Sequence, residues 1–243
     1  MALLEARDLT VTFGGNRALS GATLHADPRH ITGLIGPNGA GKTTMFNIIC
    51  GLLKPDSGDV LLRGESLLGK NPTRRARLGL ARTFQRLELF TMMSVRENVQ
   101  VAVETQRALR ATGATRRRVD ELLDRVGLLG RADERVTNLP TGQARLVELA
   151  RALACDPSVL LLDEPASGQD DTETATFAAL LRELAAGGLA VVMVEHDMRL
   201  VMEVCDPIHV LDFGRVLAVG SPDEIRTNEA VLAAYLGAQK EAS

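Results

Sequence analysis

The sequence has no excess of basic residues. Its 243 residues include 28 Lys and Arg against 31 Asp and Glu, which gives a formal net charge of -3. A protein that binds nucleic acid mainly through the phosphate backbone needs a positively charged surface. The charge balance therefore argues against sequence-independent binding to nucleic acid, and we expect no nucleic-acid partner.

Long apolar runs are also missing. A membrane-spanning helix needs about 18 or more consecutive apolar residues. The longest runs here, at 159–162 and 189–194, have the length of strands and end in acids. The first eight residues, MALLEARD, lack the basic-then-apolar order of a signal peptide and already carry acids. We therefore expect a cytoplasmic chain that does not cross a bilayer by itself.

Cysteine is scarce and has no motif around it. Cys50, Cys155 and Cys205 lie far apart in apolar stretches, without Cys-x-x-Cys spacing or neighbouring histidines. This pattern predicts small core residues in a reducing compartment rather than a metal or redox site. With 45% hydrophobic residues the chain can bury a sizeable core, as one or two domains, so extensive disorder is excluded.

Apolar spacing predicts an α/β fold. Apolar residues alternate from 9 to 13 before a Gly-Gly-Asn turn, which predicts an N-terminal hairpin of antiparallel strands. The runs at 159–162 and 190–194 do not alternate, which is typical of strands buried on both faces of a parallel sheet. The remaining periodic segments predict strands at 31–35 and 60–64 and helices at 43–50 and 172–186.

Two other segments have a different character. Basic residues accumulate from 70 to 82, and we expect this stretch to be exposed at the surface. Residues 95–126 have a helical period that is interrupted by Thr-Gly-Ala-Thr at 112–115. This predicts two helices joined by a polar turn, inserted into the α/β fold.

Residues 36–43, GPNGAGKT, match the phosphate-binding pattern G-x-x-x-x-G-K-[ST] between a predicted strand and a predicted helix. Glycines let the backbone curl so that successive N–H groups face phosphates, and the helix adds the positive end of its dipole. Lys42 would reach the β- and γ-phosphates, and the Thr43 hydroxyl would ligate Mg²⁺. The alternative is a glycine-rich turn without a ligand.

Polar side chains follow the two central apolar runs. Asp163 and Glu164 end the first run, and His196 ends the second. Because the carboxyl ends of parallel strands meet at one edge of a sheet, we expect His196 to lie near Glu164 and the glycine-rich loop. Asp163 is placed to hold Mg²⁺, and Glu164 to act as general base for a water attacking the γ-phosphate. Solvated strand ends and a structural histidine are the alternatives.

Further motifs stand in the order of an ABC transporter ATPase, which the chain resembles over essentially its whole length. They are Arg82-Thr83-Phe84-Gln85, Leu139-Pro140-Thr141-Gly142-Gln143, Leu161-Leu162-Asp163-Glu164-Pro165, Ser167-Gly168-Gln169-Asp170 and Glu195-His196-Asp197. Within that family, segments 81–85, 94–99 and 194–198 look like the ATP-binding subunits of branched-chain amino acid importers.

The resemblance implies a P-loop NTPase fold with a mostly parallel sheet, an N-terminal antiparallel β subdomain and a helical insert. Residues 1–85 and 140–243 would form the nucleotide-binding core together with the antiparallel β subdomain. Residues 86–139 would form a helical subdomain that contacts membrane subunits.

The same resemblance implies roles for individual residues. Gln85, Glu164 and His196 would be catalytic, and Thr43, Gln85 and Asp163 would hold Mg²⁺. The residues expected to contact ATP are Phe13, Asn38, Gly39, Ala40, Gly41, Lys42, Thr43 and Thr44, with Thr141, Gly142 and Gln143 reaching the nucleotide of the opposing subunit. Phe13 would stack on adenine, although a core position in the hairpin is an alternative. Asp170 would lie at the dimer interface.

The implied function is ATP hydrolysis, with Mg²⁺, that energises an importer of branched-chain or other hydrophobic amino acids. Each chain carries one phosphate-binding P-loop, residues 36–43, and one signature loop, residues 139–143, which in this family completes the site of the opposing subunit. The active unit would therefore be a head-to-tail homodimer or heterodimer. Transmembrane permease subunits would be direct partners and a solute-binding protein an indirect one, at the inner face of the cell membrane. Alternatives are a soluble ABC-type ATPase outside transport and a weakly active regulatory subunit of a heterodimer.

The chain departs from the family pattern at two notable positions. Pro140 stands where the signature usually has serine, and proline offers neither a hydroxyl nor a backbone N–H. We therefore expect a slow or regulatory composite site. Gln169 stands where leucine is usual, which makes the expected interface more polar and suits a non-identical partner.

Overall fold

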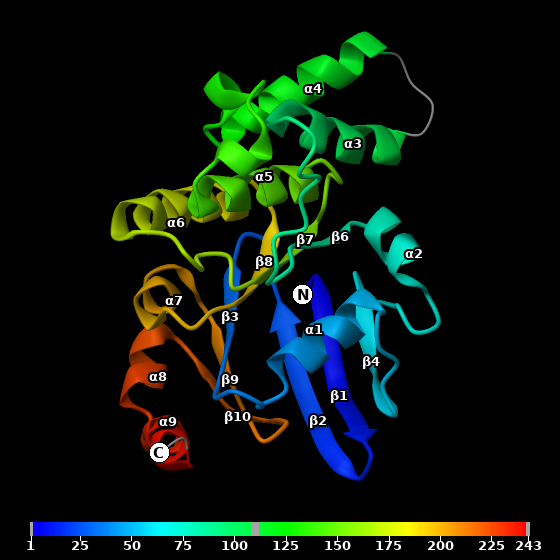
Figure 1. The fold of residues 1–243 in the computed structure, drawn as a ribbon. Helices are drawn as coiled ribbons and strands as arrows, with labels where there is room; N and C mark the ends of the chain where they lie inside the picture. The colour runs from blue at the N-terminus through cyan, green and yellow to red at the C-terminus, as the bar shows by residue number, and fades with distance from the viewer. Residues whose placement is uncertain (1, 108–111, 242–243) are drawn as a thin grey trace.

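The computed structural model describes residues 2–107 and 112–241, and its described strands form two sheets (Figure 1). The first sheet has the order β2–β1–β4–β5 and comprises β1 (Leu4–Phe13), β2 (Asn16–Ala26), β4 (Ser57–Leu62) and β5 (Glu65–Ser66). The second has the order β10–β9–β3–β8–β7–β6 and comprises β3 (Ile31–Ile35), β6 (Leu80–Arg82), β7 (Val159–Asp163), β8 (Ala190–Val194), β9 (Ile208–Asp212) and β10 (Arg215–Gly220).

The first sheet is antiparallel, and strands β1 and β2 confirm the predicted hairpin. Within β1 the buried positions change phase, from Leu4 and Ala6 to Leu9 and Val11. The change falls at Asp8, which has a φ of 50° and lies at a register shift against β2. Because such a bulge breaks the period of two, the alternation in the sequence shows only the part of the strand that follows it.

The second sheet is parallel from β9 to β6, and β10 adds an antiparallel edge. Strands β3, β7 and β8 are buried at every residue, as their apolar runs predicted. The α/β prediction is therefore confirmed. Because these strands are parallel, the loops that follow them leave from one edge of the sheet.

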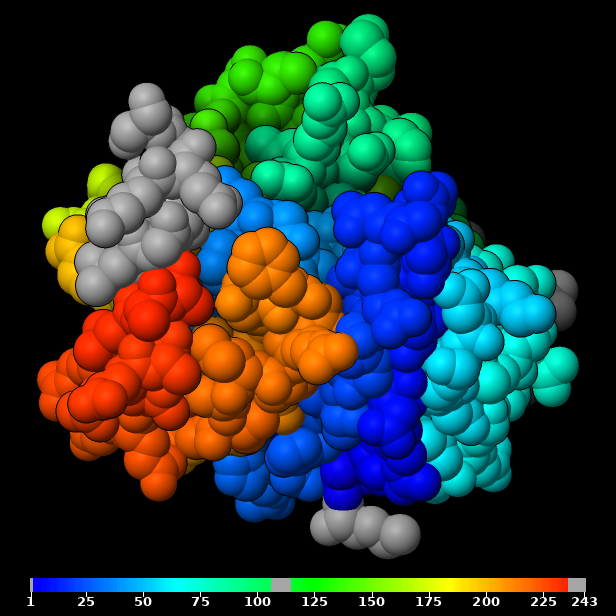
Figure 2. Space-filling model, turned by 90° about the horizontal axis from the view of Figure 1, so that it is seen from below, coloured from blue at the N-terminus to red at the C-terminus, as the bar shows by residue number. Residues whose placement is uncertain are grey.

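Helices cover the second sheet and join it to the first. They are α1 (Lys42–Cys50), α5 (Thr141–Leu153), α6 (Asp171–Ala186), α7 (Met198–Val204), α8 (Pro222–Thr227) and α9 (Glu229–Glu241). Leu160 and Leu162 of β7 face a core shared with α5 and α6, whereas Leu161 faces a core shared with α1 and the first sheet. In Figure 2 the N-terminal strands, in blue, lie beside the β9–β10 segment, in orange.

Two helices, α3 (Val95–Arg107) and α4 (Thr112–Arg125), lie over α5, as Figure 1 shows. Val99 and Val119 belong to the same core cluster as Val147 of α5. The two predicted helices are confirmed, but the break predicted at 112–115 is wrong, because these residues lie in α4. Packing of Val119 and its neighbours stabilises the helix across a segment whose composition favours a turn. Among the described residues, no helix is both long and apolar enough to span a bilayer.

The basic stretch from 70 to 82 is only partly exposed. It forms α2 (Pro72–Arg77) and β6, and Leu80 and Ala81 are buried. Arg75 is 3% exposed, and its guanidinium donates to the backbone oxygens of Ile48 and Ile49, both at 2.7 Å, and of Lys70 at 2.9 Å. Two of these carbonyls lie in the last turn of α1, where helix carbonyls have no partner within the helix. The prediction of an exposed stretch is confirmed for residues 71–74 and 77 but wrong for Arg75, Leu80 and Ala81.

We predict that Arg75→Met lowers the free energy of unfolding by about 2 kcal/mol, because the carbonyls of Ile49 and Lys70 lose a side-chain donor while that of Ile48 keeps the N–H of Gly51 at 3.0 Å. Urea denaturation followed by circular dichroism measures this loss. Arg77→Met, on the same short helix but at an exposed position, is the matched control and should change stability by less than about 0.5 kcal/mol. Equal effects of the two substitutions would contradict the capping role of Arg75.

Candidate active site

The loop between β3 and α1 requires glycine at two positions. Gly36 has a φ of 151° and Gly41 a φ of 108°. A Cβ atom would lie 2.0 Å from the backbone oxygen of Leu211 at Gly36, and 2.6 Å from that of Ala18 at Gly41. Gly41 is also the N-cap of α1, and no side chain bonds to the first amides from that position. The loop therefore presents backbone N–H groups at the start of a helix, which suits a phosphate.

Lys42 lies beneath this loop and is 7% exposed. Its Nζ donates to the backbone oxygens of Gly36 at 2.7 Å and Pro37 at 2.9 Å. Burial lowers the pKa of Lys42, and the negative charges of Glu164 and Asp163 oppose that shift. The structure thus brings the lysine of the loop within electrostatic reach of Asp163, which ends β7, and of Glu164, which follows it.

Glu164 lies between the other two predicted catalytic residues. Its Oε2 accepts from Nε2 of Gln85 at 3.0 Å, and its Oε1 lies 2.9 Å from Nε2 of His196. Its φ of 49° places it in the left-handed region, which costs a non-glycine residue about 1–3 kcal/mol. Nε2 of His196 can donate in this contact, because an ionised carboxylate only accepts hydrogen bonds. The geometry fixes the orientation of both carboxylate oxygens.

Three side chains that support these residues were not identified from the sequence. Glu195, 5% exposed, accepts from the backbone N–H of Ala166 at 2.8 Å and of His196 at 2.9 Å, and so joins the segments after β7 and β8. Arg145 of α5 donates to the backbone oxygens of Phe84 and Gln85. Arg82 donates to Asp163. Glu195 and Arg82 belong to motifs, but only the tertiary contacts reveal what they hold.

The predicted signature residues begin α5. Pro140 is the N-cap and supplies no side-chain hydrogen bond, and Thr141 is exposed. Gly142 is buried, and a Cβ there would lie 2.6 Å from a carboxylate oxygen of Glu173. Gln143 accepts from Arg131 of the preceding segment. These residues therefore offer the amide end of a helix, with Glu173 beside it.

Asp170, which is expected at the dimer interface, has a local structural role. Asp170 is the N-cap of α6, and its Oδ1 accepts from the backbone N–H groups of Thr172 and Glu173, both at 2.8 Å. Glu173 completes a capping box by accepting from the backbone N–H of Asp170 at 3.2 Å. Nearby, a Cβ at Gly168 would lie 3.0 Å from Thr141, so this loop contacts the start of α5.

The structure decides between the two expected positions of Phe13. Phe13 ends β1 and is 50% exposed, so the alternative of a core position is wrong.

His25 and His209, which nothing in the sequence singles out, pack ring against ring with centroids 4.9 Å apart. Burial lowers the pKa of His209 to about 4. This pair lies on β2 and β9 and takes no part in the arrangement around Glu164.

The side chains near the loop suit a hard cation. Thr43 offers a hydroxyl and Asp163 a carboxylate, and oxygen ligands of this kind suit Mg²⁺. In the part of the chain that the structure describes, no three His, Cys, Asp or Glu side chains converge as a metal cage. A Mg²⁺ ion at this place would take its other ligands from phosphate oxygens and water, which is usual for nucleotide sites.

Comparison with known proteins agrees with this geometry. Residues 19–167 match the family "ABC transporter", and residues 215–241 match "Branched-chain amino acid ATP-binding cassette transporter". The chain is 41% identical to the high-affinity branched-chain amino acid transport ATP-binding protein LivG of Escherichia coli, covering 97% of this chain and 98% of that protein. It is 32% identical to the lipopolysaccharide export system ATP-binding protein LptB of Haemophilus influenzae, covering 98% and 99%.

Solved structures show the same architecture. A nucleotide-free ATP-binding cassette from an ABC transporter superposes with a TM-score of 0.87 at 25% identity, covering 97% of this chain and 99% of that one. The dimeric post-hydrolysis state of the cassette MJ0796, bound to ADP and Pi, gives a TM-score of 0.79 at 26% identity, covering 90% and 98%.

The parallel sheet, the glycine-rich loop and the acids after β7 define a P-loop ATPase. The family match and the relatives then specify the class further, and the chain belongs to the ABC transporter family. It is an ATP-hydrolysing ABC cassette, like the ATP-binding transport subunits that it resembles.

We predict that Pro140→Ser raises the ATPase rate about five-fold, because serine adds a hydroxyl and a backbone N–H where proline has none, and one hydrogen bond contributes about 1 kcal/mol. The measurement is steady-state ATPase activity of the assembled transporter at saturating ATP. Pro222→Ser, at the first turn of α8, is the matched control and should leave the rate unchanged. An unchanged or lower rate for Pro140→Ser would refute the prediction.

Proposed function

We propose that this chain energises an ABC importer of branched-chain or other hydrophobic amino acids. The observation that carries the ATPase chemistry is Glu164, bonded to Gln85 and His196, beside the buried Lys42 and Asp163. The cargo rests on likeness alone: LivG and the C-terminal match point to branched-chain amino acids. LptB is a more distant relative in an export system, so import is the inference favoured by the higher identity.

We assign the binding of phosphates to the loop amides and Lys42, and the binding of Mg²⁺ to Thr43, Asp163 and Gln85. When bound, Mg²⁺ neutralises phosphate charge. Glu164 would accept the proton of the attacking water, and His196 holds one of its carboxylate oxygens through the contact at 2.9 Å. Catalysis in this scheme comes from positioning and charge stabilisation rather than from a covalent step.

The proposed active unit is a head-to-tail dimer. Each chain supplies one phosphate loop and one signature, and the α5 N-terminus at Thr141, Gly142 and Gln143 would bind the γ-phosphate held by the opposing subunit. Phe13, half exposed at the β1–β2 turn, would stack on the adenine of its own subunit. Pro140 supports a second candidate, in which this chain is the weakly active member of a heterodimer.

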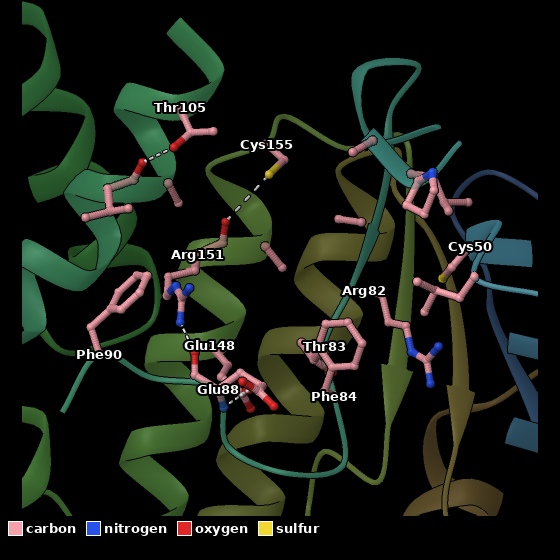
Figure 3. Close-up of a pocket in the computed structure, with 18 residues that line it drawn as sticks. Cys50, Arg82, Thr83, Phe84, Glu88, Phe90, Thr105, Glu148, Arg151 and Cys155 are labelled. Carbon is pink, nitrogen blue, oxygen red and sulfur yellow. Dashed lines mark hydrogen bonds between the residues drawn. The ribbon is translucent and has the colours of Figure 1, made fainter. Parts of the chain in front are cut away.

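A groove near the α3–α5 helices would receive the membrane subunit. A cavity of about 490 Å³ lies between α2, β6 and the segment after it on one side and helices α3 and α5 on the other. Figure 3 shows the residues that line it. Its lining is mostly apolar, and the Arg151 guanidinium lies 4.8 Å from the Phe90 ring centre at one side. We propose that residues 86–139 form the subdomain that binds a short permease helix here. The chain would then lie on the inner face of the membrane, with a solute-binding protein as an indirect partner.

Replacing the general base tests the catalytic assignment. We expect Glu164→Gln to lower the ATPase rate by about 100-fold or more while ATP binding persists, because the amide cannot take the proton of water. Steady-state ATPase assays measure the rate, and gel filtration with ATP and Mg²⁺ reports a trapped dimer. Glu203→Gln, at an exposed glutamate on α7, is the control. Retained activity in Glu164→Gln would contradict the role of Glu164, and an ATP-bound monomer would favour a different ATPase partner.

Docking in the groove is tested separately. Phe90→Asp should lower co-purification with the permease subunits at least ten-fold and leave the ATPase activity of the isolated chain unchanged, because it places a charge in an apolar contact. Leu217→Asp is the matched control, since Leu217 is 39% exposed and Phe90 43%. Equal loss of binding in both variants would argue against this groove as the docking site.

A further inference from the structure

Arg82 connects the two segments that carry the predicted Mg²⁺ ligands. It ends β6, and its Nη2 donates to Oδ2 of Asp163 at 2.7 Å. Its Nη1 donates to Oδ1 of Asn47 on α1, also at 2.7 Å. Asn47 lies four residues after Thr43 in the same helix, so the two side chains leave the same face one turn apart. One guanidinium therefore joins the helix of Thr43 to the carboxylate of Asp163.

This contact is buried and held in a defined orientation. The side chains of Arg82 and Asp163 are 7% and 5% exposed. The Arg82 guanidinium carbon lies 5.5 Å from the ring centre of Phe46 and 5.0 Å from that of Phe84, within the range of cation–π contacts. Contacts with two aromatic rings and hydrogen bonds to two acceptors restrict the rotation of this planar group. Lysine, with a single ammonium group, cannot reproduce this fork.

A buried ion pair contributes little net free energy to folding. Desolvation of two charges offsets most of their attraction, and apolar residues of similar size often stabilise a protein as well. Arg82 also leaves one hydrogen-bond donor, Nε, without a partner among the described residues. The arrangement is therefore weak evidence for a stabilising role. Its partners are Asp163, a predicted metal ligand, and Asn47, which lies one turn from the predicted metal ligand Thr43. This favours a role in the site rather than in the core.

We propose that Arg82 is a positioning residue for Mg²⁺. It holds Oδ2 of Asp163, so that Oδ1 would be the oxygen available to the cation or its water, and through Asn47 it links that carboxylate to the helix that carries Thr43. Partners outside the first coordination shell that orient metal ligands commonly contribute 10–100-fold to metal affinity. This inference rests on the proposed binding of Mg²⁺ by Thr43 and Asp163.

Binding of Mn²⁺, which can replace Mg²⁺ and is detected by electron paramagnetic resonance, tests the proposal without relying on turnover. The full chain is used in a Glu164→Gln background with ATP present. We expect Arg82→Met to raise the Mn²⁺ dissociation constant at least ten-fold and Arg82→Lys to raise it less. Binding of a fluorescent ATP analogue in EDTA should change by less than two-fold in each variant.

Two further variants keep the outcome decisive. Arg96→Met also breaks an arginine–aspartate contact, but one with Asp120 and Asp133 near helices α3 and α4, so its Mn²⁺ affinity should match the parent. Asn47→Ala removes only one end of the link and should raise the Mn²⁺ dissociation constant about three-fold, which tests the proposal if Arg82→Met does not fold.

Opposite results would overturn the proposal. An unchanged Mn²⁺ dissociation constant in Arg82→Met, or in Asn47→Ala where Arg82→Met does not fold, would show that the link does not position the metal ligands. Tighter Mn²⁺ binding in Arg82→Met would show that Arg82 competes with the cation. If the Glu164→Gln parent binds ATP in EDTA but no Mn²⁺ at all, the assignment of Thr43 and Asp163 as metal ligands fails instead.

Discussion

The close approach of the phosphate loop to its two neighbouring strands is the constraint on which the site depends. The missing Cβ atoms of Gly36 and Gly41 let the loop contact the backbone oxygens of Leu211 on β9 and Ala18 on β2. These strands belong to different sheets, so the loop lies where the two sheets meet. The position of Lys42, and of the helix that carries Thr43, follows from that contact. A side chain at either glycine would displace all of them together.

Buried arginines near this loop are each paired with a carboxylate. Arg82 is paired with Asp163, and Arg145 with Glu148 at 3.1 Å. Each arginine also contacts the segment between β6 and α3, through Phe84 or the backbone oxygen of Gln85. Residues 83–90 of that segment form no helix or strand, yet they place Gln85 next to Glu164. The two arginines, each held by an ion pair, therefore fix the position of this segment, which has no hydrogen-bonded secondary structure of its own.

The sequence was most informative where a local pattern has a single physical explanation. The buried parallel strands and the meeting of Glu164 with His196 could be predicted, because apolar runs and parallel topology leave few alternatives. The burial of Arg75 and Arg82 could not, since a basic stretch normally indicates a solvated surface and only distant carbonyl or carboxylate partners make burial favourable. The break at 112–115 failed for a similar reason, because contacts between α4 and its neighbours outweigh local helix propensity.

The shared use of Phe84 has a thermodynamic consequence. Its side chain lines the groove and also lies against the guanidinium that holds Asp163 (Figure 3). Two ligands that shift the same contacts affect each other's affinity. By linkage, any occupant of the groove that shifts Arg82 changes the affinity for the cation, and the cation changes the affinity for that occupant by the same factor. Under the proposed assignments, cation binding and docking in the groove would be linked through Phe84, Arg82 and Asp163.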